Sequence, residues 1–288
     1  PLAERLTEAA SQFGARGYDT LPAMLAAEKP QLVVIASPTK FHPDHALAAF
    51  AAGADVFSDK PLAASLAEAE RMVAGAQQAG RKLMIYQPHR VTQECQSIRA
   101  LLARDLIGKP FLLKRTCSRY ARRNDWQALT ANGGGMLNNY GAHFIDQTLY
   151  LAGSAPKRSF GALRTAVSVG DADDVVKLVL ELESGMLVDL DINQAAAQTE
   201  APWVIHGPRG SITQEAGGKA WLVKHVPASD LPPLTLQSGL AASGRQYGTG
   251  EVIPWQDLRV PIAETPALDY YDLVHAHFAR GEAPFVPL

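Results

Sequence analysis

The sequence predicts an α/β protein in which an incomplete, doubly wound parallel sheet precedes an α+β domain with a large, mainly antiparallel sheet. Up to about residue 90, strand and helix patterns alternate, which is typical of parallel strands joined by crossover helices. After that point strand patterns follow one another directly, as they do in antiparallel sheets. We therefore expect a first, partial domain over 1–90 and a second domain over 91–288.

The first domain is expected to contain three buried strands separated by helices. The segment QLVVIAS (31–37) is an unbroken, β-branched run, as expected for a strand that is covered on both faces. Gly53 and Gly80 follow helical patterns and mark the ends of helices. The expected strands are 31–37, 54–60 and 82–87, and the expected helices lie before Gly14, over 42–52 and over 66–79.

The second domain is expected to hold a sheet with one covered face. Apolar and polar residues alternate strictly over 175–193 around the turn ESG (183–185), which predicts a hairpin. One helix is expected over 92–104 and another over 135–152. The expected strands are 111–120, 159–167, 175–183, 186–193, 202–207, 210–215 and 221–226.

Composition excludes several classes of protein. The chain has 288 residues, 47% of them hydrophobic and 19% charged, so it can bury a full core. A net charge of −2 gives no electrostatic footprint for nucleic acid or an acidic membrane surface. Cys95 and Cys117 are the only cysteines, which indicates neither a disulfide framework nor a cysteine metal site. No apolar run approaches the ~20 residues of a membrane helix, so we expect a cytoplasmic protein. Both ends of the sequence look cut from a longer chain, so the alternative of a leader peptide before residue 1 is left open.

The segment GGGMLNNYGAHFID (133–146) combines a glycine run with polar residues at helical spacing. Glycine runs cost conformational entropy, so they are expected where the backbone turns sharply or passes close to another group. Asn139 and His143 are four residues apart and would lie on one face of a helix. The segment therefore predicts a loop that leads into a helix presenting an amide and an imidazole side by side.

A polar segment, ASPTKFHPDH (36–45), is expected at the carboxyl end of the first strand, where open parallel sheets bind ligands. Thr39 and the backbone around Pro38 would face this crevice. His42 and His45 could suggest zinc, but no cysteine lies near them, so we favour structural or capping histidines and expect no metal.

A second polar segment, SDKPLA (58–63), follows the next strand and places Asp59 and Lys60 at the same edge of the sheet. A lysine at this position, followed by a proline, would point into the crevice. Taken alone, a surface lysine is the more common case. Whether Lys60 is interpreted as a site residue therefore depends on the other segments.

Several segments, taken in order, resemble the Gfo/Idh/MocA oxidoreductases, which act on sugars, inositols and related polyols. The shared features are the lysine–proline pair, the triple glycine and the histidine after it, together with QPHR, RDLIGKP, RRNDW and HGPRGSI. The resemblance extends from residue 1 to about residue 280. It implies that the parallel sheet is an incomplete Rossmann-type, dinucleotide-binding domain and that the cofactor is NAD or NADP.

The resemblance also implies roles for individual residues. Lys60 would be the lysine of the family's EKP motif and His143 the histidine of its D-x-G-x-H motif, both beside the carbon that gives or takes hydride. Two positions differ from the family, which usually has glutamate at Asp59 and aspartate at Asn139. The expected catalytic residues are Lys60, His143 and Asn139, and the expected cofactor contacts are Ser37, Pro38, Thr39, His42, Asp59 and Lys60.

Oxidation of an alcohol releases a proton, so a base must lie within hydrogen-bond reach of the hydroxyl. A histidine with an ordinary pKa of about 6.5 can serve near neutrality, and the Lys60 ammonium can stabilise a developing alkoxide. A desolvated Lys60 could take the proton instead of His143. Either residue could therefore be the base, and the other would then stabilise or orient the substrate. Asn139, as an amide, can only orient the ring and bond to substrate hydroxyls, whereas a carboxylate would favour the imidazolium.

Planar polar groups and aromatic faces suit the recognition of sugars. The expected substrate contacts are Arg90, Arg123, Asn124, Trp126 and Asn139. For the segment RRNDW (122–126), a solvated loop anchored by its tryptophan is an equal alternative. Asp146 is expected to hold its helix in place rather than to contact substrate.

A G-x-G-x-x-G turn, which cradles the pyrophosphate of a dinucleotide, does not occur in the sequence. We expect that turn before residue 1 and the final helix of such proteins after Leu288, so the 288 residues alone would bind cofactor poorly. The alternatives to a dehydrogenase are an NAD-dependent glycosidase on the same fold and a non-catalytic sugar-binding relative. The expected partners are a small carbohydrate or polyol and further copies of the chain, in a homodimer or homotetramer formed through the antiparallel sheet, whose polar face bears Lys177, Asp189 and Asp191.

Overall fold

The computed structural model describes residues 3–236, 238 and 248–288. Its smaller sheet is parallel, with β1 (Leu32–Ile35), β2 (Asp55–Ser58) and β3 (Leu83–Ile85) paired in that order. The helices of this layer are α1 (Ala3–Phe13), α2 (Leu21–Glu28), α3 (His42–Ala51) and α4 (Leu66–Ala79). The predicted parallel layer is confirmed.

The ends of α4 follow from its local sequence. The Ser65 hydroxyl accepts a hydrogen bond from the Glu68 amide at 3.3 Å and so satisfies a free donor of the first turn. Gly80 adopts φ 62° at the other end, a left-handed conformation that glycine reaches without steric cost. The helix is therefore delimited on both sides, and the segment that links β2 to its first turn carries Lys60.

The larger sheet has eight strands in the order β11-β10-β9-β8-β4-β7-β6-β5. β4 pairs with β7 in parallel, and every other neighbouring pair is antiparallel, which confirms the predicted mainly antiparallel sheet. The strands are β4 (Leu112–Ser118), β5 (Pro156–Arg164), β6 (Val175–Leu182), β7 (Leu187–Asn193), β8 (Trp203–Gly207), β9 (Gly210–Gln214), β10 (Ala220–His225) and β11 (Gln256–Pro261).

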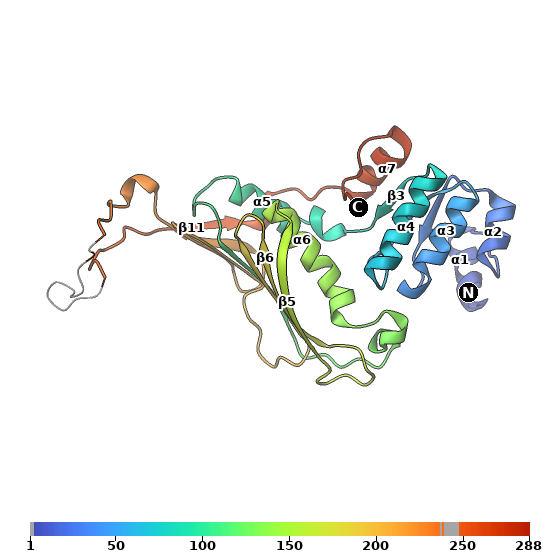
Figure 1. Ribbon diagram of the computed structural model, residues 1–288, viewed down its shortest axis with the longest axis horizontal. Helices are drawn as coiled ribbons and strands as arrows, with labels where there is room; N and C mark the ends of the chain where they lie inside the picture. Colours follow the sequence, from blue (N-terminus) through green and yellow to red (C-terminus); the bar gives the residue numbers. More distant parts are fainter. Residues whose placement is uncertain (1–2, 237, 239–247) are drawn as a thin grey trace.

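One face of this sheet is covered by α5 (Gln93–Leu102) and α6 (Ala142–Ala152). Figure 1 shows α6 on the side of the large sheet that faces the parallel layer. The buried members of the predicted hairpin lie opposite one another, as in the pairs Val176–Ile192 and Leu180–Val188. The strict alternation between 175 and 193 therefore places one row of apolar side chains beneath the helices.

The strand predicted at 159–167 lies three residues earlier, at Pro156–Arg164. The carboxylate of Asp174 accepts hydrogen bonds from the backbone amides of Ala166, Val167 and Ser168 at 2.7–2.9 Å. These amides therefore leave the strand ladder and bend around the carboxylate. A strand pattern read from side chains alone cannot reveal such a competing acceptor.

The helix predicted over 135–152 begins later and in a wider form. Residues Leu137–Gly141 form a π-helical turn, called η5, and regular α-helix follows only from Ala142. The backbone amide of Leu137 donates to the Asp173 carboxylate at 2.8 Å, and the Met136 amide donates to the Asp173 carbonyl at 2.9 Å. Asp173 therefore holds the start of this turn, which a helical pattern does not predict.

The sequence pattern also does not predict β11 or the helix α7 (Tyr270–Arg280). α7 packs on the parallel sheet, where Tyr270 and Val274 join Phe57 and Met84 in a buried cluster. The Tyr270 hydroxyl donates to the Ile85 carbonyl at 2.8 Å, directly at the end of β3. The division of the chain at residue 90 stays a prediction, but late residues clearly contribute to the first layer.

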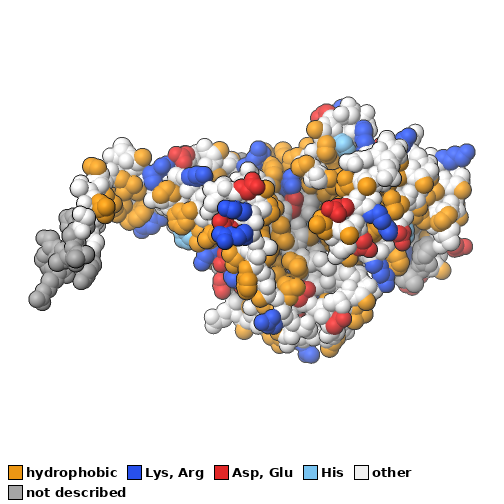
Figure 2. All heavy atoms as spheres, in the orientation of Figure 1, with side chains coloured by type: hydrophobic (Ala, Val, Ile, Leu, Met, Phe, Trp, Pro, Cys, Tyr) orange, Lys and Arg blue, Asp and Glu red, His pale blue; other side chains and the backbone are white. Residues whose placement is uncertain are grey.

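Within the described ranges, every helix falls short of the length or apolar character that a membrane-spanning helix requires. On the face drawn in Figure 2, acidic and basic side chains are interspersed rather than gathered in one patch.

Candidate active site

The segment that carries Lys60 is fixed to the end of β1 by a buried histidine. The His42 ring is 1% exposed and contacts the carbonyl of Pro61 through Nδ1 at 3.0 Å and that of Ser37 through Nε2 at 2.8 Å. The Asp59 amide donates to the Ile35 carbonyl at 2.8 Å. These contacts hold the ends of the two strands together, so the backbone of Lys60 has a defined position.

The Lys60 side chain reaches the helix motif of the second domain. Its Nζ donates to Oδ1 of Asn139 at 2.7 Å and to the backbone carbonyl of Asn139 at 3.0 Å. The amide group of Asn139 in turn donates to Oε1 of Gln127 at 2.9 Å. Two segments 79 residues apart therefore meet at one contact.

The pKa of Lys60 is lower than that of an ordinary surface lysine. Burial lowers the pKa of its ammonium, and the nearby Asp59 carboxylate opposes this effect without cancelling it. Asn139 accepts hydrogen bonds from the ammonium but adds no negative charge. Lys60 is therefore able to exchange a proton more readily than a solvated lysine.

The glycine run that precedes Asn139 lies between two groups that leave no room for side chains. A Cβ atom on Gly134 would lie 2.3 Å from the Gln127 carbonyl oxygen, and one on Gly135 would lie 2.3 Å from the Asp173 carboxylate. Gly135 also has φ +100°, which other residues rarely adopt. The run therefore allows the loop with Gln127 to approach the start of η5 and the Asn139 amide closely.

The π-helical turn changes how Asn139 and His143 relate. In a regular helix the two side chains would lie one above the other on one face. The wider turn directs Asn139 to Lys60, while the neighbouring Asn138 donates to the carbonyls of Gly133 and Gly134 at 3.2 and 3.1 Å. Isolated π turns within helices occur frequently at functional sites.

His143 lies at the first turn of α6 and is 8% exposed. Its Nδ1 is 3.2 Å from Oε1 of Gln87, and its ring stacks on that of His89 with a centroid distance of 3.9 Å and an interplanar angle of 7°. Burial lowers the pKa of His143 to about 3, with further contributions from His89 and the Lys60 ammonium. The imidazole is therefore neutral near pH 7.

Gln87 and His89 are not among the site residues expected from the sequence, although both belong to the segment QPHR. They follow β3 at the same carboxyl edge as Ser37 and Lys60, and they belong to or border the short helix η2 (Pro88–Val91). The rule that ligands bind at this edge of a parallel sheet would have selected them.

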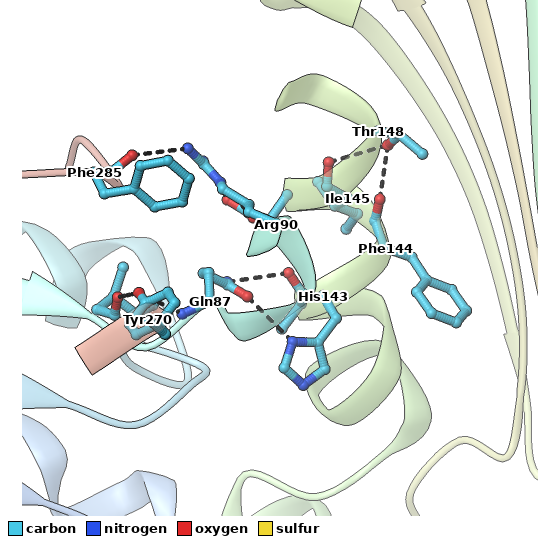
Figure 3. A network of polar contacts seen from close by, with 11 residues as sticks. Gln87, Arg90, His143, Phe144, Ile145, Thr148, Tyr270 and Phe285 are labelled. Atoms are coloured by element: carbon cyan, nitrogen blue, oxygen red, sulfur yellow. Dashed lines mark hydrogen bonds and ion pairs between the residues drawn. The ribbon is translucent and has the colours of Figure 1, made fainter. Parts of the chain in front are cut away.

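Arg90, also in this segment, has a partner within the protein. Its guanidinium donates to both carboxylate oxygens of Asp146 at 2.8 and 2.5 Å. It also donates to the Phe285 carbonyl at 3.3 Å, the contact drawn in Figure 3. The pair ties η2 to α6, which agrees with the expectation that Asp146 holds its helix. The role of Arg90 in substrate binding stays a prediction, and these contacts do not support it.

The segment RRNDW lies on the loop that brings Gln127 to Asn139. Arg123 pairs with Asp125, Asn124 is exposed, and Trp126 is 42% exposed. Lys40 donates to Oδ1 of Asn132 at 2.7 Å and so links this loop to the parallel layer. The loop therefore borders the site, and the substrate roles of its residues stay predictions.

A cavity of about 550 Å³ adjoins His89 on the covered side of the large sheet. Arg115 forms part of its wall, held between the rings of Phe144 and Trp203 with its guanidinium carbon 4.3 and 4.5 Å from their centroids. Polar groups from β4, from η5 and from the loop before β8 line the rest, among them Cys117, Tyr140 and Glu200. The cavity has the size and the mixed polar and aromatic walls that suit a small polyhydroxylated ligand.

A second cavity, of about 660 Å³, opens at the carboxyl end of β1, where Ser37 and Pro38 line it together with Tyr18 and His45. With Asp59 and Lys60 at the end of β2, this edge offers hydroxyl, carboxylate and ammonium groups that fit the ribose and nicotinamide part of a dinucleotide. Thr39 and His42 are buried beside this edge, so their contact with a cofactor stays a prediction. No group of three or more potential metal ligands lies together among the described residues.

Comparison with known proteins agrees with this geometry. Residues 1–87 match the family model described as an oxidoreductase family with an NAD-binding Rossmann fold, and residues 95–213 match that of the GFO/IDH/MocA C-terminal domain. These matches define an oxidoreductase built on an NAD-binding Rossmann layer. The chain belongs to the Gfo/Idh/MocA oxidoreductase family, and the predicted cofactor class, NAD or NADP, is confirmed at the level of that family.

The named relatives differ in their reactions. The chain is 31% identical over 165 residues to D-glucoside 3-dehydrogenase of Escherichia coli, a match covering 55% of the chain and 47% of that protein. It is 24% identical over 209 residues to 2,7-anhydro-N-acetylneuraminate hydratase of Escherichia coli, covering 69% of the chain and 56% of that protein. The matches thus span about half the length of these curated relatives.

The fold as a whole is found in a solved structure. The crystal structure of an NAD-binding protein from Listeria innocua superposes with a TM-score of 0.83, covering 99% of the chain and 82% of that protein, at 24% sequence identity. At this identity the likeness supports the arrangement of the two sheets and not a particular substrate.

Proposed function

We propose that the chain carries the catalytic groups of an NAD(P)-dependent oxidoreductase that transfers hydride between a nicotinamide cofactor and a secondary alcohol or ketone of a sugar, inositol or related polyol. The observation that carries the proposal is the 2.7 Å contact from Lys60 Nζ to Asn139 Oδ1. It joins an ammonium at the dinucleotide edge of the parallel sheet to the helix that presents His143. Family membership supports the reaction class, and the name of the D-glucoside relative supports the class of substrate.

The pKa shifts favour one division of labour between the two residues. A base whose pKa is about 3 is a weak acceptor for the proton of an alcohol, whereas the lowered pKa of Lys60 brings it closer to the working range. Lys60 therefore exchanges the proton. His143, as a neutral ring, accepts a hydrogen bond from a neighbouring hydroxyl of the substrate and so orients the carbon that bears the reacting hydroxyl. When bound, the nicotinamide supplies the hydride acceptor or donor.

Asn139 acts on Lys60 in this scheme. Its Oδ1 accepts from the ammonium, and its amide group donates to Gln127, so the side chain is fixed at both ends. A neutral acceptor orients the lysine without stabilising its charge as a carboxylate would. The Asn139 amide therefore keeps Lys60 available as a base.

The cavity beside His89 is proposed to hold the part of the substrate that does not react. Its wall includes His89, and the stack of His89 on His143 links the cavity to the proposed catalytic residues. Arg123, Asn124 and Trp126 are proposed to contact the substrate from the loop that bears Gln127.

The test measures turnover of the Lys60→Met and His143→Asn variants in the full-length protein, with a panel of sugars, inositols and polyols and with both NAD⁺ and NADP⁺. Loss of an acid–base group is expected to lower kcat by about 10²- to 10⁴-fold. Lys40→Met is the matched control, since Lys40 is an exposed lysine that contacts Asn132 outside the proposed centre. Near-full turnover in both site variants would remove Lys60 and His143 from the mechanism.

The match to the hydratase favours a second candidate, in which a transient oxidation labilises a bond of the substrate, as in an NAD-dependent glycosidase. Formation of a cleaved or hydrated product without net accumulation of NADH would identify this reaction. Saturable sugar binding without any turnover would indicate a non-catalytic relative.

The assembly and the location of the protein belong to the proposal. A homodimer or homotetramer through the antiparallel sheet stays a prediction; on the polar face of that sheet, Lys177 pairs with both Asp189 and Asp191 within the chain. A cytoplasmic location, and the absence of membrane and nucleic-acid partners, stay predictions.

A further inference from the structure

The side chain of Gln87 lies between a backbone carbonyl and the His143 ring. Its Nε2 donates to the carbonyl of Ala142 at 3.2 Å, and its Oε1 lies 3.2 Å from Nδ1 of His143 (Figure 3). The residue is 6% exposed, and its own backbone amide donates to the Tyr270 hydroxyl at 2.9 Å. Both ends of the Gln87 amide and its backbone are therefore held by α6 and α7.

This arrangement allows only one orientation of the amide. A backbone carbonyl can accept a hydrogen bond but cannot donate one, so the NH₂ group of Gln87 must face Ala142. The oxygen of Gln87 must then face His143, and because an amide oxygen is also only an acceptor, Nδ1 must carry the proton. We propose that Gln87 is the positioning residue that fixes the tautomer of His143, so that Nδ1 is protonated and Nε2 presents its lone pair.

Rotation of the ring would not undo this selection. A 180° turn of the ring would place Cδ2 in the position of Nδ1 and lose the hydrogen bond to the Gln87 oxygen. The flat stack of His89 on one side, with 7° between the two ring planes, holds the plane of the imidazole. The opposite tautomer would place a lone pair against the Gln87 oxygen. It would also present an N–H at Nε2, where the ring has to accept a hydrogen bond from a substrate hydroxyl. The catalytic meaning of the tautomer rests on the proposed function, but the tautomer itself does not.

The direct test is nitrogen NMR on the 288-residue chain labelled with ¹⁵N-histidine, with the His143 signals assigned by their loss in His143→Asn. The expected result at pH 7 is a protonated, pyrrole-type Nδ1 and an unprotonated, pyridine-type Nε2. Gln87→Leu is expected to shift the population toward the Nε2–H form that free histidine prefers. An Nε2–H tautomer in the unaltered protein, or an unchanged tautomer in Gln87→Leu, would overturn the inference.

Gln147→Leu is the matched control. Gln147 is a buried glutamine at the same junction, and its Nε2 donates to the His89 carbonyl at 3.1 Å. The substitution removes one hydrogen bond between η2 and α6 but leaves the contact to Nδ1 in place. The tautomer is therefore expected to stay as it is, and an equal shift in both variants would reduce Gln87 to a purely structural role.

Gln87→Glu adds a second readout. A carboxylate in place of the amide still accepts from Nδ1 and adds a negative charge, so the pKa of His143 is expected to rise from about 3 by about 1–3 units. His89 and the Lys60 ammonium are the titratable groups that lower this pKa, and both stay in place. NMR titration measures the shift of the His143 pKa without substrate. An inactive protein with the expected tautomer would therefore count against the proposed function alone. An active protein whose His143 pKa is unchanged in Gln87→Glu would count against the role of Gln87.

Discussion

The carboxyl ends of β2 and β3 are neighbours in one sheet, yet they contribute to the site in different ways. The end of β2 presents Lys60, whose partly buried ammonium crosses to Asn139 through its side chain alone. The end of β3 is bound to α6 by a set of contacts that includes Gln87 to His143 and Arg90 to Asp146. The difference shows that an edge of a parallel sheet can supply a reactive group at one strand and a rigid support for the other reactive group at the next.

Substitutions at the end of β3, the region that supports His143, are expected to lower the free energy of unfolding more than substitutions at the end of β2. In Arg90→Met the Asp146 carboxylate loses its partner. The side chains of Arg90 and Asp146 are largely buried, at 11% and 13% exposure, so the remaining carboxylate has little access to water. Breaking a buried pair from one side typically costs about 3–5 kcal/mol because a charge is left uncompensated. Urea unfolding monitored by circular dichroism measures the change in the free energy of unfolding.

The double variant Arg90→Met with Asp146→Leu provides the control, since it removes both charges. It is expected to recover much of the loss, because apolar residues of similar size often replace a buried pair at little cost. If the single variant were as stable as the unaltered protein, the junction between η2 and α6 would not depend on this pair.

His143 links the same region to acid stability. Because the folded pKa is lowered to about 3, the unfolded chain binds the proton first, so stability falls as the pH drops below the unfolded value of about 6.5. By pH 5 the expected loss from this ring is about 2 kcal/mol. Measuring the free energy of unfolding at pH 7, 6 and 5 gives the slope.

The variant His143→Gln lacks the titrating ring and is expected to show a shallower loss over the same range. The pKa of His89 is lowered as well, by burial first and then by Arg115, so part of the slope stays in the variant. Identical slopes with and without His143 would mean that its ring is not held neutral by the fold.

The two regions also differ in how far the sequence predicts them. Lys60 and His143 stand in short segments whose order along the chain carries the resemblance to the family, so both could be proposed as site residues without coordinates. Gln87 depends on where the carbonyl of Ala142 lies, and Gln127 depends on the close approach allowed by Gly134. Such contacts arise from the packing of distant segments and leave no local pattern.

The elements themselves show the same limit. The three parallel strands and the hairpin of β6 and β7 follow from apolar patterns alone, and the structure confirms them. The shift of β5 and the π turn both result from aspartates, Asp174 and Asp173, whose carboxylates compete for backbone amides. The sequence shows these aspartates but not which amides they face.

The side chain at position 139 is expected to set how readily Lys60, at the end of β2, releases its proton. In Asn139→Asp a carboxylate would replace the amide oxygen that lies 2.7 Å from Lys60 Nζ. An opposite charge at this distance raises the pKa of a lysine by about 1–3 units. If Lys60 takes the proton during alcohol oxidation, the rising limb of kcat against pH moves to higher pH by the same amount, and turnover at neutral pH falls.

The matched control for this change is Asn132→Asp. Its Oδ1 also accepts from a lysine at 2.7 Å, but that lysine is the exposed Lys40. The control therefore adds the same charge beside a comparable ion without touching Lys60, and its pH profile is expected to match that of the unaltered protein. The added carboxylate at position 139 also raises the pKa of His143, yet from about 3 this ring stays mostly neutral at pH 7. A profile for Asn139→Asp that coincides with the control would show that Lys60 does not set the limb, and the proton would then have to leave through another group.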